Sequence, residues 1–172
     1  MSTSMVKGNP LKLMLQFALP LLIGNLLQQT YNIIDAAIVG QILGAKALAS
    51  VGASSSVQFL VLGFCMGSCT GFGVPVAKYF GADDLEKMRN YIFNGAVLVA
   101  AIAMVVTGTC SILCQQILHL LSVPEDIFEG AYAYLIVIFL GIPFTLMYNY
   151  LSSVLRSVGD SRTPFIFLAF SA

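Results

Sequence analysis

The sequence predicts an all-α fold, a polytopic transmembrane helix bundle, and three observations support this prediction. Hydrophobic residues make up 58% of the 172 residues and charged residues only 9%, whereas a soluble domain carries about a quarter charged residues. The charges lie in short patches between long apolar runs. Several of these runs exceed the roughly 20 residues that a membrane-spanning helix needs.

Five apolar runs follow one another along the chain. Four are long enough for complete spans, and the fifth only begins before the sequence stops. The first run is too long for a cleavable signal peptide, and further runs follow it. The connections are short, so neighbouring helices are expected to run antiparallel within a single domain, residues 1–172. The expected spans are residues 13–43, 47–77, 91–121, 131–155 and, incomplete, 164–172.

Capping patterns predict where helices begin and end. Gly159 is expected to end the fourth helix, and Asp160 or Ser161 to cap the fifth. Asp83 and Ser122 are each followed three residues later by a glutamate. This spacing resembles a capping box, so both residues are expected to start helices, Asp83 a short amphipathic one.

The basic residues predict the orientation of the chain. Seven of the eight lie on one side of the predicted bundle, and only Lys46 lies on the other. Because positive residues are retained in the cytoplasm, we expect a cytoplasmic N-terminus and a multi-pass protein of the plasma membrane. The seven residues are Lys7, Lys12, Lys78, Lys87, Arg89, Arg156 and Arg162.

A polar stripe runs along the first span and ends at Asp35, the only ionisable residue inside any apolar run. The spacing places its members on one side of an α-helix, which must face protein or water rather than lipid. One interpretation is the wall of an aqueous cavity in which Asp35 binds a cation or a proton. The other is an interhelical hydrogen-bond seam near the outer surface. The stripe consists of Asn25, Gln28, Gln29, Asn32 and Asp35.

The fourth span has a second polar run that includes Tyr148 and Asn149. These side chains either line the same cavity as Asp35 or tie helices together. Prolines interrupt three spans and allow bends, because each removes an intrahelical hydrogen bond. These candidate hinges are Pro20, Pro75 and Pro143.

Gly63, Gly67 and Gly71 repeat a small-residue spacing on the second span. Such spacing lets another helix come close, and we expect packing within the molecule rather than homodimerisation. The four cysteines form two pairs spaced four residues apart on membrane helices. We interpret them as small apolar residues and expect no metal site. One histidine and no nucleophile–base set argue against an enzyme, and no cofactor is expected.

Three stretches resemble the multidrug and toxic compound extrusion (MATE) transporters: FALPLLIGNLLQQTYNIIDAAIVGQILGAKALASVG, PVAKYFGADDLEKMRNYI and LRSVGDSRTP. The resemblance covers nearly the whole chain. It implies export of organic cationic or amphipathic compounds, driven by inward Na⁺ or H⁺. It also places the family's first-helix acid at Asp35 and its bend-forming proline at Pro20.

MATE transporters resemble two six-helix lobes around a central cavity, so residues 1–172 would supply a truncated N-terminal lobe. We therefore expect transport from the full-length protein and not from this chain alone. Expected partners are small organic substrates, the lipid bilayer and the C-terminal lobe. Nucleic acid is not expected, because the net charge is +0.

Two other classes of protein remain as alternatives. The chain could be a small membrane scaffold or interaction protein that oligomerises through the glycine face of the second helix. The other alternative is a membrane-embedded enzyme, and the missing nucleophile–base set argues against it.

Overall fold

The computed structural model describes residues 10–171 and the side chains of residues 11–167. The described residues form five α-helices and one π-helical turn, and the all-α prediction is confirmed. Lys7 and Ala172, which entered the predictions, lie outside the described residues. The elements are α1 (Pro10–Ile38), η1 (Val39–Leu43), α2 (Gly44–Gly81), α3 (Leu85–Leu120), α4 (Glu125–Ser157) and α5 (Arg162–Ser171).

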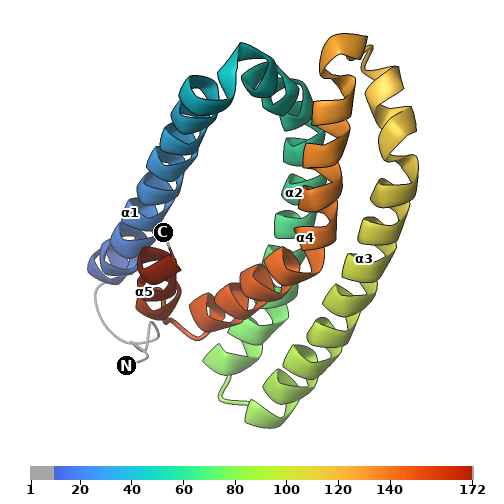
Figure 1. Ribbon diagram of the computed structural model, residues 1–172. Coiled ribbons are helices and arrows are strands. Elements are labelled where there is room, and N and C mark those ends of the chain that lie inside the picture. Colours follow the sequence, from blue (N-terminus) through green and yellow to red (C-terminus); the bar gives the residue numbers. More distant parts are fainter. Residues whose placement is uncertain (1–9, 172) are drawn as a thin grey trace.

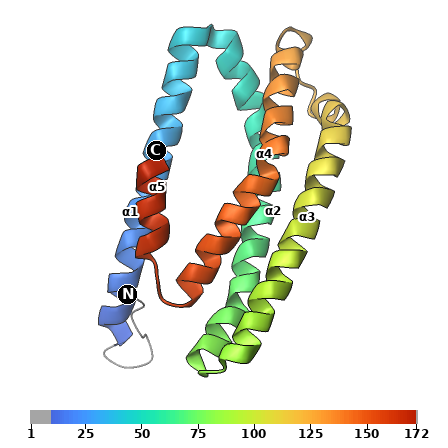
Figure 2. The same cartoon turned by 60° about the horizontal axis from the view of Figure 1, so that its bottom comes forward.

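The helices form a three-helix bundle with an arm beside it. Figure 1 shows α2, α3 and α4 packed side by side, while α1 stands apart and η1 joins it to α2. Figure 2 shows the short α5 returning to lie along α1. We call the end with η1 and the α3–α4 turn the upper end. The end with the α2–α3 turn and the α4–α5 connection is the lower end.

Three continuous helical segments are long and apolar enough to cross a membrane: residues 11–81, Leu85–Leu120 and Glu125–Ser157. The first contains both α1, of 29 residues, and α2, of 38 residues, because η1 continues the helical backbone through the upper turn. At about 1.5 Å per residue, each of these two helices exceeds the roughly 30 Å of a bilayer core. The fold therefore offers four helices of spanning length.

The contact between α2 and α4 is close because small residues face each other there. Ser50 and Ser54 on α2 donate hydrogen bonds to the carbonyl oxygens of Ile127 and Ala131 on α4, at 3.2 and 3.5 Å. Further down, the Ser157 hydroxyl on α4 donates to the carbonyl oxygen of Gly73, at 2.8 Å. Interhelical hydrogen bonds of this kind join helices where no water competes for the groups.

No described helix packs closely against Gly63, Gly67 or Gly71, so the packing role predicted for them stays a prediction. A Cβ added at any of the three would meet nothing within 4 Å. The glycine of α2 that does pack is Gly73, where an added Cβ would lie 2.5 Å from the Ser153 hydroxyl oxygen. Glycine spacing shows that a helix face is smooth, and it does not show whether a partner helix lies on that face.

The contact between α3 and α4 rests on Tyr150 and on large apolar side chains. The Tyr150 hydroxyl donates to the carbonyl oxygen of Ile92, at 2.6 Å. The ring lies against Gly95, where an added Cβ would be 2.6 Å from that hydroxyl. Leu135 and Phe139 of α4 are fully buried in the same core.

The two capping boxes predicted at Asp83 and Ser122 are wrong. Both residues have positive φ, 58° and 52°, and each lies one residue beyond the C-cap of the preceding helix. In that left-handed position their N–H groups satisfy carbonyl oxygens of the helix that has just ended. The α3 helix is instead capped by Asp84, whose carboxylate accepts a hydrogen bond from the backbone N–H of Lys87 at 3.1 Å.

The connection from α4 to α5 follows the prediction. Gly159 has φ 84° and ends α4, and the carboxylate of Asp160 caps α5. This carboxylate accepts hydrogen bonds from the backbone N–H groups of Arg162 and Thr163, at 3.1 and 3.0 Å, and from the Thr163 hydroxyl at 2.6 Å. These bonds, the Thr163 hydroxyl first, lower the pKa of Asp160 below its ordinary value.

The α4 helix bends partway along its length, so that its lower half leans towards α1 (Figure 1). Pro143 is the proline inside this helix, and a proline is the usual cause of a sharp helix bend. Pro20 and Pro75 likewise lie inside α1 and α2. A hinge role for any of them stays a prediction.

Candidate functional site: a polar cavity beside α1

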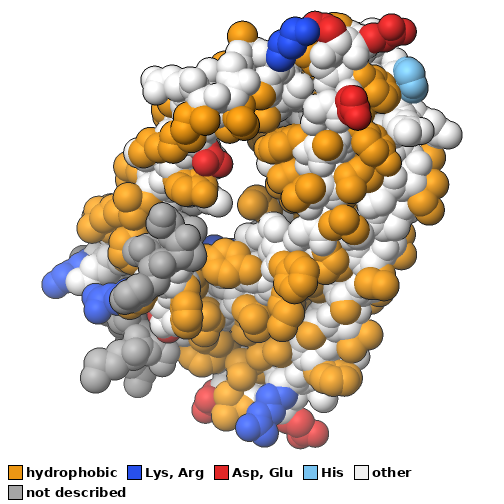
Figure 3. Space-filling view, in the orientation of Figure 1, with side chains coloured by type: hydrophobic (Ala, Val, Ile, Leu, Met, Phe, Trp, Pro, Cys, Tyr) orange, Lys and Arg blue, Asp and Glu red, His pale blue; other side chains and the backbone are white. Residues whose placement is uncertain are grey.

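A hollow separates α1 from the bundle, and the polar stripe of α1 faces it. Figure 3 shows this opening in the space-filling view. Two adjoining cavities occupy it, which we call the upper cavity and the lower cavity. Gln28 and Met66 line both cavities, so the two spaces meet at these side chains.

The upper cavity has a volume of about 570 Å³. From α1 it is lined by Gln28, Gln29, Asn32 and Asp35, which are four of the five members of the predicted stripe. The bundle contributes Ser55, Gln58 and Gly63 of α2 and Tyr134 of α4. Asp35 is the only charged side chain among the described residues that line it.

Asp35 is exposed to this space and has no ion pair or side-chain hydrogen bond with another described residue. Its neighbours on the stripe bond locally: the Asn32 amide donates to the Gln29 side-chain oxygen at 3.1 Å. Among the described residues, no hydrogen bond joins the stripe to another helix. Within the described residues the stripe therefore lines a cavity, and a role in binding an ion or a substrate stays a prediction.

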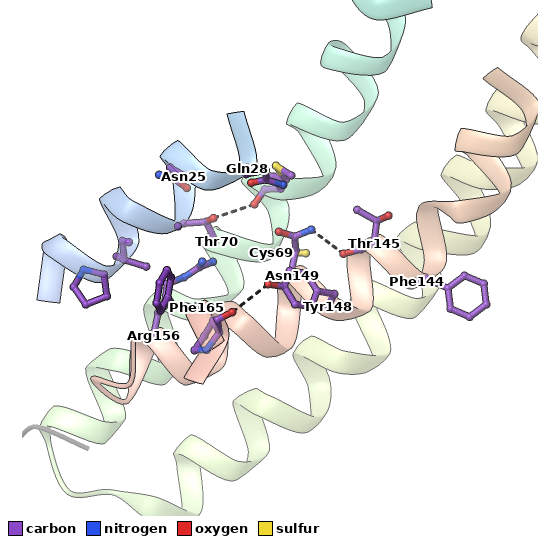
Figure 4. A pocket seen from close by; sticks show the side chains of 15 residues that line it. Asn25, Gln28, Cys69, Thr70, Phe144, Thr145, Tyr148, Asn149, Arg156 and Phe165 are labelled. Carbon is purple, nitrogen blue, oxygen red and sulfur yellow. Dashed lines mark hydrogen bonds between the residues drawn. The ribbon is translucent and has the colours of Figure 1, made fainter. Parts of the chain in front are cut away.

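The lower cavity has a volume of about 510 Å³ and lies between α1, α2, α4 and α5. From α1 it receives Pro20 and Asn25, the fifth member of the stripe. Tyr148 and Asn149 line it from the lower half of α4 (Figure 4). The bend of α4 brings this half towards α1, so the bend helps to form the cavity.

Tyr148 combines the two predicted alternatives, cavity lining and a bond between helices, whereas Asn149 fits only the first. Both line the lower cavity, and the Tyr148 hydroxyl also donates to the carbonyl oxygen of Pro164 on α5, at 3.5 Å. The Asn149 amide donates to the carbonyl oxygen of Thr145, at 2.8 Å, within its own helix. This bond leaves the Asn149 side-chain oxygen free to accept a hydrogen bond from a molecule in the cavity.

Several cavity residues were not predicted from the sequence. Arg156 was interpreted only as a flanking charge, yet it lines the lower cavity together with Cys69 and Thr70. In the upper cavity the side chains of Tyr134 and Gln58 hydrogen-bond to each other at 3.3 Å. Gln58 could have been found, because it is the only side-chain amide in residues 47–77.

The cysteines lie mainly in the helix contacts. Cys65, Cys69 and Cys114 are buried, and all four cysteines are free thiols. The Cys69 thiol lies 3.6 Å from the carbonyl oxygen of Leu146 on α4, within reach of a weak hydrogen bond. Among the described residues, no group of three or more His, Cys, Asp or Glu side chains is arranged to hold a metal ion.

Helices of membrane-spanning length around a polar, partly charged cavity define a polytopic α-helical membrane protein with room for a drug-sized molecule. The MatE family profile matches residues 20–172. The chain therefore belongs to the MATE family of transporters, which are not enzymes, and the resemblance noted in the sequence is confirmed.

Curated relatives support this assignment. Probable multidrug resistance protein YpnP of Bacillus subtilis is 36% identical over 165 residues, covering 96% of this chain and 37% of YpnP. Multidrug export protein MepA of Staphylococcus saprophyticus is 25% identical over 156 residues, covering 89% of this chain and 34% of MepA. The chain thus spans little more than a third of the length of these relatives.

Solved structures show the same fold. An outward-facing multidrug resistance MATE family transporter of the MOP superfamily is 24% identical with a TM-score of 0.89, covering 98% of this chain and 38% of that protein. A MOP superfamily transporter from Pyrococcus furiosus is 23% identical, also with a TM-score of 0.89 and the same coverage. The described helices therefore correspond to one part of a MATE fold.

Proposed function

We propose that the full-length protein containing residues 1–172 is a secondary active exporter. It exchanges organic cationic or amphipathic compounds for inward-moving Na⁺ or H⁺. The single observation that carries this proposal is Asp35, a carboxylate without a partner on the cavity wall of a membrane helix.

The position of Asp35 favours a role in ion coupling. Asp35 lies in the last turn of α1, so the cost of about 2.5 to 3.5 kcal/mol that insertion scales give for a carboxylate at the centre of a membrane helix is an upper bound for it. No described side chain offsets this cost by pairing with Asp35. A bound Na⁺ or proton would do so, and Asn32, one helical turn earlier, adds an amide oxygen of the kind that hard cations prefer.

The remaining polar side chains of the two cavities support a substrate-binding role. Asn25, Gln28, Gln29, Tyr148 and Asn149 present donors and acceptors along a space of drug-like volume. Polar groups within an otherwise apolar wall orient an amphipathic molecule without binding it too tightly to leave. The names of YpnP and MepA, a probable multidrug resistance protein and a multidrug export protein, support the same substrate class.

We further propose that residues 1–172 form part of the N-terminal lobe and do not transport alone. The hollow beside α1 is open in this chain (Figure 3), and alternating access requires a second body to close it. The C-terminal lobe is the proposed partner, and the family's two-lobed architecture supports this arrangement.

We propose that the lower end of the bundle faces the cytoplasm of a multi-pass plasma-membrane protein. Six described basic residues lie at this end, while Lys46 lies at the upper end, where α4 begins with Glu125 and Asp126. Retention of positive charge in the cytoplasm supports this orientation. The six residues are Lys12, Lys78, Lys87, Arg89, Arg156 and Arg162.

The test is transport by the purified full-length protein in liposomes. We expect export of a cationic dye when an inward Na⁺ or H⁺ gradient is imposed, and no export by residues 1–172 alone. Gradients of the two ions applied separately would identify the coupling ion. Dye movement that ignores both gradients would contradict the proposal.

A scaffold function is the second candidate, and one observation favours it. A Cβ added at Gly63, Gly67 or Gly71 of α2 would meet no described atom within 4 Å. A second membrane helix could lie against this glycine face, either from another copy of the chain or from the C-terminal lobe.

A further inference from the structure

The two cavities differ in charge. Asp35 is the one charged side chain among the described residues that line the upper cavity, and Arg156 is the one that lines the lower cavity. The cavities meet at Gln28 and Met66. A molecule that occupies both would therefore lie between a carboxylate at one end and a guanidinium at the other.

Arg156 has no counter-ion in the described structure. Its side chain is half-buried and makes no ion pair or side-chain hydrogen bond with another described residue. Figure 4 shows it extending from the end of α4 into the space that Asn25, Thr70 and Phe165 also line. A guanidinium has five N–H donors and no acceptor, so an anionic partner can form charge-assisted hydrogen bonds with it.

The surroundings of Arg156 suit one anionic group attached to an apolar body. No Asp or Glu lines the lower cavity among the described residues, so nothing there competes with an anion for the guanidinium. Asn25 and Gln28 offer amide donors on the α1 side. Leu21 and Met66 supply apolar wall for the body of the molecule.

We propose that the lower cavity contains an anion-binding subsite in which Arg156 binds the carboxylate or phosphate group of an amphipathic molecule. Gln28 lies seven residues before Asp35, about 10 Å along the helix. Because Gln28 lines both cavities, a ligand that is anchored at Arg156 and is long enough to pass Gln28 directs its other end towards Asp35. This proposal rests on the proposed export function and adds to it. The subsite determines which amphipathic compounds the cavity prefers.

Arg156 also lies in the last turn of α4, where a positive charge stabilises the helix dipole. If Arg156 only stabilised α4 in this way, substituting it would change the binding of every ligand by the same factor. Recognition of an anion predicts an effect only on ligands that carry one. A pair of ligands that differ in a single carboxylate therefore separates the two roles.

The experiment uses rhodamine 110, which carries a carboxylate, and rhodamine 123, its methyl ester. Binding of each dye to the purified full-length protein is measured by fluorescence polarisation in a nonionic detergent at pH 8. We expect Arg156→Gln to weaken rhodamine 110 binding about tenfold, or 1.4 kcal/mol, and to change rhodamine 123 binding by less than twofold. Arg156→Lys should retain part of the preference. The control Arg162→Gln removes the same charge from the same end outside the cavity and should change neither dye.

A second arm distinguishes a substrate carboxylate from a lipid phosphate. Binding is repeated with phosphatidylglycerol or phosphatidylcholine added to the micelles, and thermal stabilisation by each lipid is recorded. If a lipid phosphate occupies the subsite, phosphatidylglycerol will stabilise the unsubstituted protein and Arg162→Gln, but not Arg156→Gln.

The subsite is overturned if Arg156→Gln affects the two dyes equally and leaves the response to phosphatidylglycerol unchanged. Failure of the export function gives a different result, because the unsubstituted protein would then not move rhodamine 123 in liposomes under either ion gradient. Gradient-driven rhodamine 123 export by the unsubstituted protein, together with loss of rhodamine 110 binding in Arg156→Gln, supports both proposals.

Discussion

Substituting Gly73 by alanine tests the close approach of α2 and α4 on which the whole bundle depends. The added Cβ would lie 2.5 Å from the Ser153 hydroxyl oxygen and 2.8 Å from that of Ser157. Both separations are well below van der Waals contact. The Ser157 hydroxyl cannot move freely, because it donates to the carbonyl oxygens of Gly73 and Ser153, each at 2.8 Å.

Relief of this overlap requires either a shift of α4 or the loss of those hydrogen bonds. Overpacking by one methyl group costs about 1 to 3 kcal/mol in a well-packed core. A value near 2 kcal/mol corresponds to a change of about 30-fold in the unfolding equilibrium. We expect Gly73→Ala to lower the midpoint of thermal unfolding in detergent by several degrees, as measured by the fluorescence of a thiol-reactive dye on the buried cysteines.

Two further variants sharpen the test. Gly67→Ala adds the same methyl group on the same helix, where nothing lies within 4 Å, so its midpoint should stay within a degree of the unsubstituted protein. The double variant Gly73→Ala with Ser153→Ala removes the nearest oxygen and should recover part of the loss. Equal midpoints for Gly73→Ala and Gly67→Ala would refute the close α2–α4 packing.

Two other predictions concern the α4–α5 connection and the glycine face. Asp160→Ala should destabilise the start of α5 by about 1 kcal/mol, because it removes the cap. The lowered pKa of Asp160 means that this contribution is present above pH 3.8 and is lost as the pH falls through the lowered pKa. Thermal midpoints of the variant and the unsubstituted protein should therefore converge in acid, and a constant difference would contradict the cap. If the C-terminal lobe covers the glycine face of α2, Gly67→Cys should give no disulfide-linked dimer of the full-length protein in membranes. Efficient crosslinking would instead favour the scaffold function.

Much of the fold follows from the sequence because lipid imposes strict rules on it. Backbone polar groups inside a bilayer must be satisfied within the chain, so long apolar runs can only be helices. The same rule places the stripe from Asn25 to Asp35 away from lipid, and four of its members line the upper cavity.

The errors have equally physical causes. The capping-box spacing after Asp83 and Ser122 is real, but both residues are already used in left-handed turns that close the preceding helices. The spacing of Gly63, Gly67 and Gly71 marks a smooth face without identifying its neighbour. The position of Arg156 after an apolar run predicts only that it lies near the membrane–water interface. It lines a cavity because α4 bends towards α1 and α5 returns along α1. Pro143 marks the bend in the sequence, but no local pattern shows which helix the bent half of α4 approaches.

The central claim is that Asp35 couples export to an inward cation, and Asp35→Asn in the full-length protein tests it most directly. The substitution keeps the size of the side chain and removes its charge. Dye export is measured in liposomes under a Na⁺ or H⁺ gradient, with Asp126→Asn as a control at the exposed start of α4. The account predicts that Asp35→Asn abolishes gradient-driven export while the control exports normally. Gradient-driven export that is unchanged in Asp35→Asn would contradict it.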